Sequence, residues 1–349
     1  MDTKQEQTAN TSSRDETIAP STIMHNAHAV YPSFAMLAAM QLDVFTPLKD
    51  GPMQAGTLAT ALDVQEDKLT PLLYSLAASG LLKMERDLFS NTAETDKFLV
   101  RGRPDYIGGL SGFYSKVWHA AMNTAESIRT GKPKQKIDWH ALPENELLFF
   151  FQSQFHSSIR AGKELADRLD FSEFERLLDA GGGTGGVSIG ICKKFPRIRA
   201  TVADLPKVTD ITGQFIAEAG MSDRIRVSPT DLCLNSPDGQ YDLRYDLAIL
   251  RALIQTLSKE QAQKVIKHIG QSMVPGGQIY IFGSILENSR LSPLSSLGAG
   301  LVFLNVYDDG KAYTENEHRE MLLNAGFADI TVEHEALVDG MGIVSARKQ

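Results

Sequence analysis

Leu177-Leu178-Asp179-Ala180-Gly181-Gly182-Gly183-Thr184-Gly185-Gly186 is the stretch that decides the fold of this chain. Its apolar start predicts a short buried strand, and the residues from Ile189 to Phe195 predict a helix after the glycines. Between the two, the backbone must turn sharply and approach a ligand closely, which side chains would prevent. The stretch therefore predicts a strand, a tight turn and a helix that together form a ligand site.

The pattern on either side of this turn predicts two domains. From residue 171 to 349, short apolar strands alternate with amphipathic helices, which indicates a doubly wound α/β domain with a parallel sheet. Residues 21–170 show mainly helical periodicity. Residues 1–20 are rich in Thr, Ser, Gln and charge, so we expect a disordered leader.

The first half of the helical domain has the order of a winged helix. Residues 23–48 predict two helices with Pro32 at a kink or break, residues 55–59 and 66–79 predict a pair of helices, and residues 80–90 predict a short hairpin. A winged helix can bind DNA, but the second helix of this pair offers Leu, Ala and Ser instead of Arg and Lys. We therefore expect no DNA binding.

Composition excludes several classes of protein. The 349 residues carry a formal net charge of -8 without a long basic run, so we expect no nucleic-acid partner. No apolar run reaches the roughly 18 to 20 residues that span a bilayer, and the polar first residues do not resemble a signal sequence, so we expect a cytoplasmic protein without a membrane partner. Cys192 and Cys233 are too few for a disulfide framework and have no metal-ligand spacing, and we expect no metal.

The glycine turn by itself allows more than one ligand. Gly181, Gly183 and Gly186 satisfy the G-x-G-x-x-G pattern of dinucleotide sites. Other features favour a nucleoside sulfonium as the ligand. Asp179 lies at the end of the strand before the glycines, and Asp204 lies at the end of the next strand, about 20 residues on, where its carboxylate suits ribose hydroxyl groups. These features also include a Thr-Asp-Leu segment at residues 230–232 and a predicted helix end, turn and strand at residues 273–281.

These segments resemble a known family in their order and spacing. Residues 175–347 are similar to class I S-adenosylmethionine-dependent methyltransferases of the plant-type O-methyltransferase family, which includes caffeate and acetylserotonin O-methyltransferases. The matching segments are DAGGGTGG at 179–186, ADLP at 203–206, TDL at 230–232, VPGG at 274–277 and AGF at 325–327. The resemblance implies a Rossmann-like sheet, S-adenosylmethionine as cofactor and a role in secondary metabolism. It also implies a C-terminal antiparallel hairpin, at Ile330 to Glu335 and Gly342 to Ala346.

The resemblance further implies partners and cofactor contacts. The helical half would form a homodimer, and a small-molecule acceptor would bind between the two domains. The methionine part of the cofactor would lie against the glycines and Asp179, the ribose against Asp204, and the adenine between the residues that follow the second and third strands. The implied cofactor residues are Asp179, Gly181, Gly183, Gly185, Asp204, Leu205, Asp231, Leu232 and Arg251.

One catalytic position departs from the family. Relatives carry a histidine that removes the proton of the acceptor hydroxyl and a carboxylate that orients it. Here Gln255 stands where the histidine is expected, and Gly283 stands where the carboxylate is expected. A phenol with a pKa of about 10 stays mostly protonated at neutral pH, and a glutamine cannot take its proton. Gln255 can still hydrogen-bond an acceptor and orient it.

Three chemistries follow from this departure. The acceptor oxygen ionises without help, or the nucleophile is carbon, or the bound cofactor serves a reaction other than methyl transfer. The carbon alternative has support in residues 297–300, which resemble the bacteriochlorophyllide C-methyltransferase branch. A ligand-sensing regulator on the same fold and an NAD-dependent oxidoreductase are the rivals from other classes. The leading hypothesis is an S-adenosylmethionine-dependent methyltransferase that acts on oxygen or carbon of a small molecule.

His156 is the first candidate for a replacement base, because its helix lines the acceptor pocket in relatives. Tyr114, His119 and His25 are weaker candidates. Glu315 and Glu317 begin the last helix, where we expect them to cap the helix and interact with its dipole.

Overall fold

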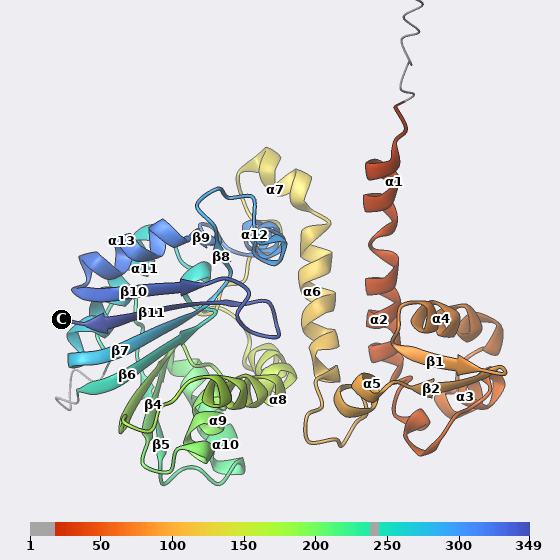
Figure 1. Ribbon diagram of the computed structural model, residues 1–349, viewed down its shortest axis with the longest axis horizontal. Coiled ribbons are helices and arrows are strands. Elements are labelled where there is room, and N and C mark those ends of the chain that lie inside the picture. Colours follow the sequence, from red (N-terminus) through yellow and green to blue (C-terminus); the bar gives the residue numbers. More distant parts are fainter. Residues whose placement is uncertain (1–17, 238–243) are drawn as a thin grey trace, which may run out of the picture.

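The computed structural model describes residues 18–237 and 244–349. The expected leader falls almost wholly on residues 1–17, which lie outside the described residues. Figure 1 shows a helical N-terminal lobe beside a larger α/β body, with the long helix α6 (Ser111–Ala121) between them. Among the described residues, no helix combines the length and the apolar character needed to cross a bilayer.

The N-terminal lobe has the expected winged-helix-like order. Its elements are α1 (Ser21–His28), α2 (Tyr31–Leu42), η1 (Pro47–Asp50), α3 (Ala55–Leu62), α4 (Glu66–Ala78), β1 (Leu82–Glu85), β2 (Leu88–Asn91) and α5 (Ala93–Phe98). Pro32 lies in the first turn of α2, where its missing N–H costs nothing, so the two-helix prediction is confirmed. The strands β1 and β2 pair antiparallel. Leu58, Leu73 and Phe89 join helices and hairpin in one core.

Three further helices connect the lobe to the sheet: α6, α7 (Thr124–Thr130) and α8 (Glu144–Arg168), with the short η2 (Gly108–Leu110) before them. The helix α8 lies against α9 (Gly186–Lys194) at backbone distance, because a Cβ on Gly190 would come within 2.7 Å of the Gly162 carbonyl carbon. The proposed boundary near residue 170 follows α8 in the chain, although α8 packs on the α/β body; the boundary stays a prediction.

The α/β body contains a seven-stranded sheet in the order β10-β11-β7-β6-β3-β4-β5. The strands are β3 (Arg176–Ala180), β4 (Arg199–Asp204), β5 (Ile225–Pro229), β6 (Tyr245–Arg251), β7 (Met273–Gly283), β10 (Phe327–Glu333) and β11 (Gly342–Lys348). The strands from β7 to β5 are parallel, whereas β11 runs antiparallel to β7 and to β10. The doubly wound sheet and its C-terminal antiparallel hairpin are therefore confirmed.

Helices cover both faces of this sheet. They are α9, α10 (Pro206–Glu218), α11 (Lys259–Gln271) and α13 (Glu315–Asn324). The helix α12 (Leu294–Val306) lies instead against α6 and α7, η3 (Ile254–Thr256) follows β6, and β8 (Ile285–Leu286) and β9 (Tyr313–Thr314) form a small pair. Successive residues of β3 enter different cores: Leu177 packs with Ile189 of α9, and Leu178 packs with Val265 of α11. Because β7, β6, β3, β4 and β5 are parallel, their carboxyl ends lie at one edge of the sheet.

One local prediction was wrong. The stretch at 273–281 was expected to begin with a helix end and a turn, but α11 already ends at Gln271 and β7 begins at Met273. Met273 pairs with Tyr245, and the register then shifts so that Gln278 pairs with Leu247. Gly276 takes a φ of 82° inside this irregular stretch. The glycines therefore form a bulge within a strand, because tertiary pairing with β6 overrides their turn preference.

Candidate active site

The glycine turn after β3 requires glycine at several positions. Gly181, Gly183 and Gly185 have φ values of 67°, 53° and 71°, in the left-handed region that side chains rarely adopt. The Gly181 N–H donates to the Ala203 carbonyl oxygen at 2.7 Å, which ties the turn to the end of β4. This hydrogen bond fixes the backbone of the turn at the carboxyl edge of the sheet.

Several of these glycines serve packing as well. A Cβ on Gly186 would lie 2.5 Å from the Ser158 Cβ on α8, and a Cβ on Gly182 would lie 2.6 Å from the Asp179 Cγ. The same position on Gly185 faces side chains of α10 at 3.3 Å. The predicted cofactor role of Gly185 stays a prediction, and the structure shows that its missing side chain makes room for α10.

Asp204 holds the turn from the neighbouring strand. Its Oδ2 accepts the Gly183 N–H at 2.8 Å, and its Oδ1 accepts the N–H of Leu205 at 2.8 Å. Burial raises the pKa of Asp204 to about 6, although the two backbone N–H groups act to lower it. Each carboxylate oxygen keeps a further lone pair for ligand hydroxyl groups. Leu205 is the N-cap residue of α10 and packs toward Phe215 and its neighbours.

Asp179 is the most buried charged group of the site, at 1% exposure. Its Oδ2 accepts the Ser188 hydroxyl at 2.7 Å, while its Oδ1 has no hydrogen-bond partner among the described residues. Burial raises the pKa of Asp179 to about 6, the Ser188 hydrogen bonds lower it, and the nearby Asp204 raises it further. A buried oxygen without a partner is costly, so this atom fits a positively charged or hydrogen-bonding ligand.

Asp231 and Leu232 follow β5 at the same edge. The Asp231 Oδ1 accepts the Cys233 N–H at 2.9 Å, and its Oδ2 lies 3.9 Å from Nε2 of the exposed His140. Leu232 is buried in the core beneath the sheet edge, so only a small part of it faces outward. His140 was not predicted from the sequence, because it lies in an irregular segment far from Asp231 along the chain.

Arg251 ends β6 and forms an ion pair that the sequence did not reveal. Its Nη2 donates to the Asp339 Oδ2 at 2.5 Å, and its buried Nε has no partner among the described residues. Arg251 also lowers the pKa of Asp179 by its charge. The Val338 N–H donates to Glu164 of α8 at 2.8 Å, so the connection between β10 and β11 bridges Arg251 and α8.

Gln255 lies in η3 and is 8% exposed. Its Oε1 accepts the Ser284 N–H at 3.0 Å, just past the end of β7. A Cβ on Gly283 would lie 2.3 Å from this oxygen, so the glycine leaves the space that the Gln255 amide fills. Leu253, two residues earlier, lies against Gly181, where a Cβ would be 3.0 Å from its Cδ2. The segment that carries Gln255 therefore contacts the glycine turn through Leu253.

The candidate substitute bases do not form a catalytic pair in the described residues. His156 is exposed on α8, where its ring lies 5.6 Å from that of Phe155. The side chains of His25 and His119 are exposed. Burial raises the pKa of Tyr114, and Asp339 raises it further, while Arg160 lowers it. A base role for His156 stays a prediction.

The glutamates at the start of α13 have the expected capping role. Thr314 and Glu317 form a reciprocal capping box. Burial by itself would raise the pKa of Glu317, but the Thr314 backbone N–H and the cations Lys311 and Arg290 lower it to about 2. Glu315 pairs with Arg319 at 2.8 Å. Both carboxylates are thus engaged in helix and loop contacts.

Aromatic side chains reach the glycine turn from α8 and the segment before it. Phe151 lies so close to Gly183 that a Cβ there would be 2.9 Å from its Cε1. Phe150 contacts Phe151 and Trp139, with ring centroids 5.3 Å and 4.9 Å away. This arrangement places a mainly apolar, aromatic surface beside the cofactor residues.

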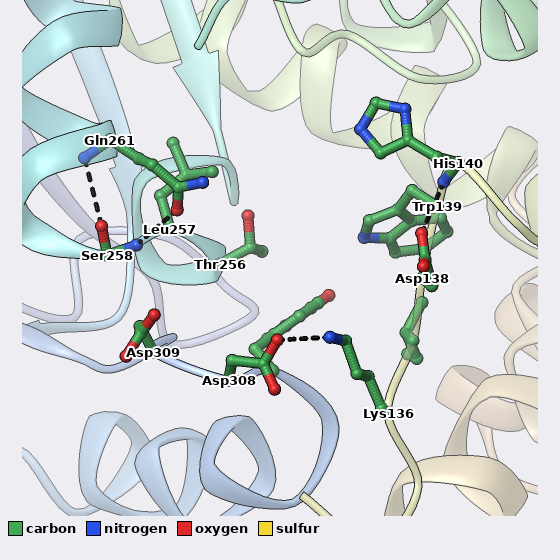
Figure 2. A pocket seen from close by; sticks show the side chains of 12 residues that line it. Lys136, Asp138, Trp139, His140, Thr256, Leu257, Ser258, Gln261, Asp308 and Asp309 are labelled. Carbon is green, nitrogen blue, oxygen red and sulfur yellow. Dashed lines mark hydrogen bonds and ion pairs between the residues drawn. The ribbon is translucent and has the colours of Figure 1, made fainter. Parts of the chain in front are cut away.

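A cavity of about 260 Å³ lies on the other side of Trp139. Figure 2 shows its walls, which come from residues 136–140, from the junction of η3 and α11, and from residues 307–309. Lys136 and Asp308 form an ion pair across one side. Burial raises the pKa of Tyr307, in the wall, to about 12. Thr256, next to Gln255, also lines it, so the cavity adjoins the candidate site.

Residues 18–237 and 244–349 contain no group of three or more His, Cys, Asp or Glu side chains suited to a metal ion. The polar groups at the site are instead carboxylates, which accept hydrogen bonds, backbone groups and a guanidinium, which donates them. Such a set, around a glycine turn, suits a charged nucleoside ligand.

The family models agree with this geometry. The O-methyltransferase domain matches residues 131–328, and the O-methyltransferase dimerisation domain matches residues 24–101. The chain therefore belongs to the O-methyltransferase family. It is an S-adenosylmethionine-dependent methyltransferase of small molecules, as the resemblance of its motifs predicted.

Individual relatives cover nearly the whole chain. The 3-hydroxy-5-methyl-1-naphthoate 3-O-methyltransferase of Streptomyces sahachiroi is 26% identical, over 94% of this chain and 95% of its own. The bacteriochlorophyllide d C-20 methyltransferase of Chlorobaculum tepidum is 23% identical, over 85% and 88%. The crystal structure of human N-acetylserotonin methyltransferase with S-adenosylmethionine shares the fold, with a TM-score of 0.79 and 22% identity over 95% and 99% of the chains.

Proposed function

We propose that this protein transfers a methyl group from S-adenosylmethionine to an oxygen atom of a small, flat, largely apolar acceptor, without a general-base histidine. The observation that carries the proposal is the position of Gln255. Its amide oxygen accepts the Ser284 N–H at the end of β7, and Leu253 of the same segment contacts Gly181 of the glycine turn. A side chain of this kind can position an acceptor but cannot remove its proton.

The residues at the sheet edge fit the cofactor. Gly181 and Gly183 would approach its methionine part, Asp204 its ribose and Asp231 its adenine amine. The unpartnered Oδ1 of Asp179 supports this assignment, since the cofactor carries positive charge. Leu205 and Leu232 would lie beside the adenine, and Arg251 would complete the contacts with the cofactor. When bound, S-adenosylmethionine supplies a methyl group on a positively charged sulfur.

The acceptor side of the site rests on the aromatic residues. Phe150, Phe151 and Trp139 form an apolar surface next to Gly183. A flat aromatic acceptor would stack there and exclude water from the reacting atoms. Catalysis would then come mainly from proximity and orientation, which are worth several orders of magnitude when the reacting atoms are held in line.

Carbon is the second candidate for the methylated atom. The similarity to the bacteriochlorophyllide d C-20 methyltransferase supports it, and a carbon nucleophile does not need the missing histidine. The two candidates differ in their products. Methyl transfer from ¹³C-labelled S-adenosylmethionine places the label in a methoxy or a C-methyl signal of the NMR spectrum.

The first experiment is calorimetric titration with S-adenosylmethionine and S-adenosylhomocysteine. We expect micromolar binding by the wild type and at least tenfold weaker binding by Asp204→Ala, because this variant loses both the ribose contact and the anchor for the Gly183 N–H. Asp210→Ala, on the exposed side of α10, is the matched control and should bind normally. Unchanged affinity of Asp204→Ala would contradict the assigned site.

A further inference from the structure

The orientation of the Gln255 amide is determined by its neighbour. A backbone N–H can only donate, so the atom that faces the Ser284 N–H at 3.0 Å must be the amide oxygen. The planar amide then directs its NH₂ group away from β7. Gly283 makes this arrangement possible, since a Cβ there would lie 2.3 Å from the same oxygen. Gln255 and Gly283 therefore form a matched pair.

The NH₂ group of Gln255 is a donor without a partner in the described part of the chain. No hydrogen bond of Nε2 occurs there, and Nε2 is not one of the fully enclosed atoms that lack a partner. The residue keeps 8% of its surface accessible. The free donor is thus not fully enclosed by the described residues, and the next residue, Thr256, lines the cavity described above.

We infer that Gln255 donates this hydrogen bond to the reacting oxygen of the acceptor in its anionic form, so that the enzyme selects acceptors whose hydroxyl group ionises near neutral pH. The inference rests on the proposed function and specifies its substrate class. A donor stabilises an anion more than a neutral hydroxyl group, because the hydrogen bond is charge-assisted. A neutral hydroxyl group gains less from such a donor, and a glutamine side chain cannot remove its proton.

The reaction balances without an enzyme base. The acceptor loses its proton to water before the transfer. The oxygen anion then forms the new bond to the methyl carbon, and the bond between that carbon and sulfur breaks. Its electron pair goes to sulfur, which leaves neutral S-adenosylhomocysteine.

The test compares two phenols of similar size. 4-Nitrophenol is largely ionised near neutral pH, whereas 4-methylphenol has a pKa of about 10, as tyrosine does. For the wild type, we expect S-adenosylhomocysteine formation with 4-nitrophenol at pH 7.5 and at least tenfold slower formation with 4-methylphenol. The kcat/KM for 4-methylphenol should rise with pH in proportion to its ionised fraction. Equal rates, or a pH profile set by a group of the enzyme, would overturn the inference.

Gln255→Glu separates a donor role from a merely structural one. Glutamate has the same shape and can still accept the Ser284 N–H, but it replaces the donor by a negative oxygen. We expect kcat/KM for 4-nitrophenol to fall roughly 10- to 100-fold, in line with the loss of a hydrogen bond to a charged group. Gln214→Glu adds the same charge on the exposed side of α10 and should be unaffected. Full activity of Gln255→Glu would refute the donor role.

Gly283→Ala tests the matched pair. Its new methyl group must displace the Gln255 amide, so the preference for 4-nitrophenol over 4-methylphenol should fall at least fivefold. Gly213→Ala adds a methyl group in open space on α10 and is the control. An unchanged preference would contradict the pairing.

Calorimetric titration of each variant with S-adenosylhomocysteine distinguishes the two levels of failure. Absence of cofactor binding by the wild type would refute the proposed function. Cofactor binding without turnover of 4-nitrophenol would leave the cofactor site intact and overturn the inferred acceptor class.

Discussion

Asp179 and Asp204 stand at the carboxyl ends of the adjacent strands β3 and β4, and burial raises the pKa of each to about 6. In the unfolded chain an aspartate has a pKa of about 3.9. Between pH 4 and pH 6 the folded protein therefore binds more protons than the unfolded one. Stability without cofactor should fall as pH rises through this window, because ionisation of both groups is costly in the folded state.

This cost predicts a stabilising substitution. Asp179→Asn removes the buried charge but keeps an oxygen that can accept the Ser188 hydroxyl. We expect the free energy of unfolding without cofactor to rise by about 1 to 2 kcal/mol at pH 7, since a shift of one pKa unit corresponds to about 1.4 kcal/mol. Affinity for S-adenosylmethionine should fall at least tenfold. Urea unfolding and calorimetry measure the two effects, with the exposed Asp210→Asn as control. A less stable variant would contradict this account of Asp179.

Cofactor affinity should depend on pH in the opposite direction to stability. Below pH 6 both aspartates become protonated, and their attraction for the positively charged cofactor is lost. We expect the affinity for S-adenosylmethionine to rise at least tenfold from pH 5 to pH 7 and to change little above that. Titrations at pH 5, 6, 7 and 8 test this. A flat profile would show that neither carboxylate contacts the charged part of the cofactor.

At the scale of elements, the contact between α8 and α9 joins the glycine turn to the aromatic surface formed by Phe150, Phe151 and Trp139. Gly162 on α8 has the α9 backbone at the place of a side chain, with the Val187 carbonyl oxygen 2.4 Å from a Cβ. Gly186 similarly admits Ser158 of α8. Because α8 also carries Phe150 and Phe151, this close packing positions these aromatic side chains next to the turn.

A methyl group at this contact should therefore affect both stability and activity. Gly190→Ala places a Cβ within 2.7 Å of the α8 backbone, which cannot rotate away. We expect a loss of about 3 kcal/mol, at the upper end for overpacking of a core, and a lower kcat. Gly213→Ala on α10 meets no atom within 4 Å and should be neutral or up to about 1 kcal/mol more stable. Urea denaturation of both variants provides the comparison, and equal stabilities would exclude the packing role of Gly190.

At the scale of the whole molecule, the N-terminal lobe leaves an apolar surface uncovered. None of the residues of α1 is buried, and its apolar side chains Ile23 and Met24 are 70% and 48% exposed. Val30, Tyr31 and Phe34 continue the exposed apolar surface onto α2. Figure 1 shows α1 projecting from the lobe. Apolar patches of this kind mark interaction sites, and the dimerisation domain covers the patch from Met24 onward.

We therefore expect a homodimer that depends on α1. Ile23→Asp combined with Met24→Asp should shift the protein from dimer to monomer at micromolar concentration, because charges would have to be buried at the interface. Leu323→Asp, at a 60% exposed apolar position on α13, is the control and should stay dimeric. Sedimentation velocity distinguishes the two masses. A double variant that remains fully dimeric would show that α1 does not form the interface.

The local patterns of the sequence by themselves predicted the strand, turn and helix around Gly181 and the alternation that forms a parallel sheet. The resemblance to the family added the C-terminal hairpin and the cofactor class, and it predicted that Gln255 and Gly283 stand where relatives carry a base and its partner. Such features depend on residues close along the chain, on backbone conformations that only glycine adopts, and on periodicity. The cofactor and catalytic residues named from these patterns stay predictions.

Only the tertiary structure decided which distant groups meet. It paired Arg251 with Asp339, left one oxygen of Asp179 without a partner among the described residues and set the Gln255 amide against Ser284. It also converted the glycines near Gly276 from an expected turn into a bulge of β7. The partners in the ion pair lie 88 residues apart along the chain, and those in the hydrogen bond lie 29 residues apart. Such contacts depend on the packing of distant segments, which no local pattern encodes.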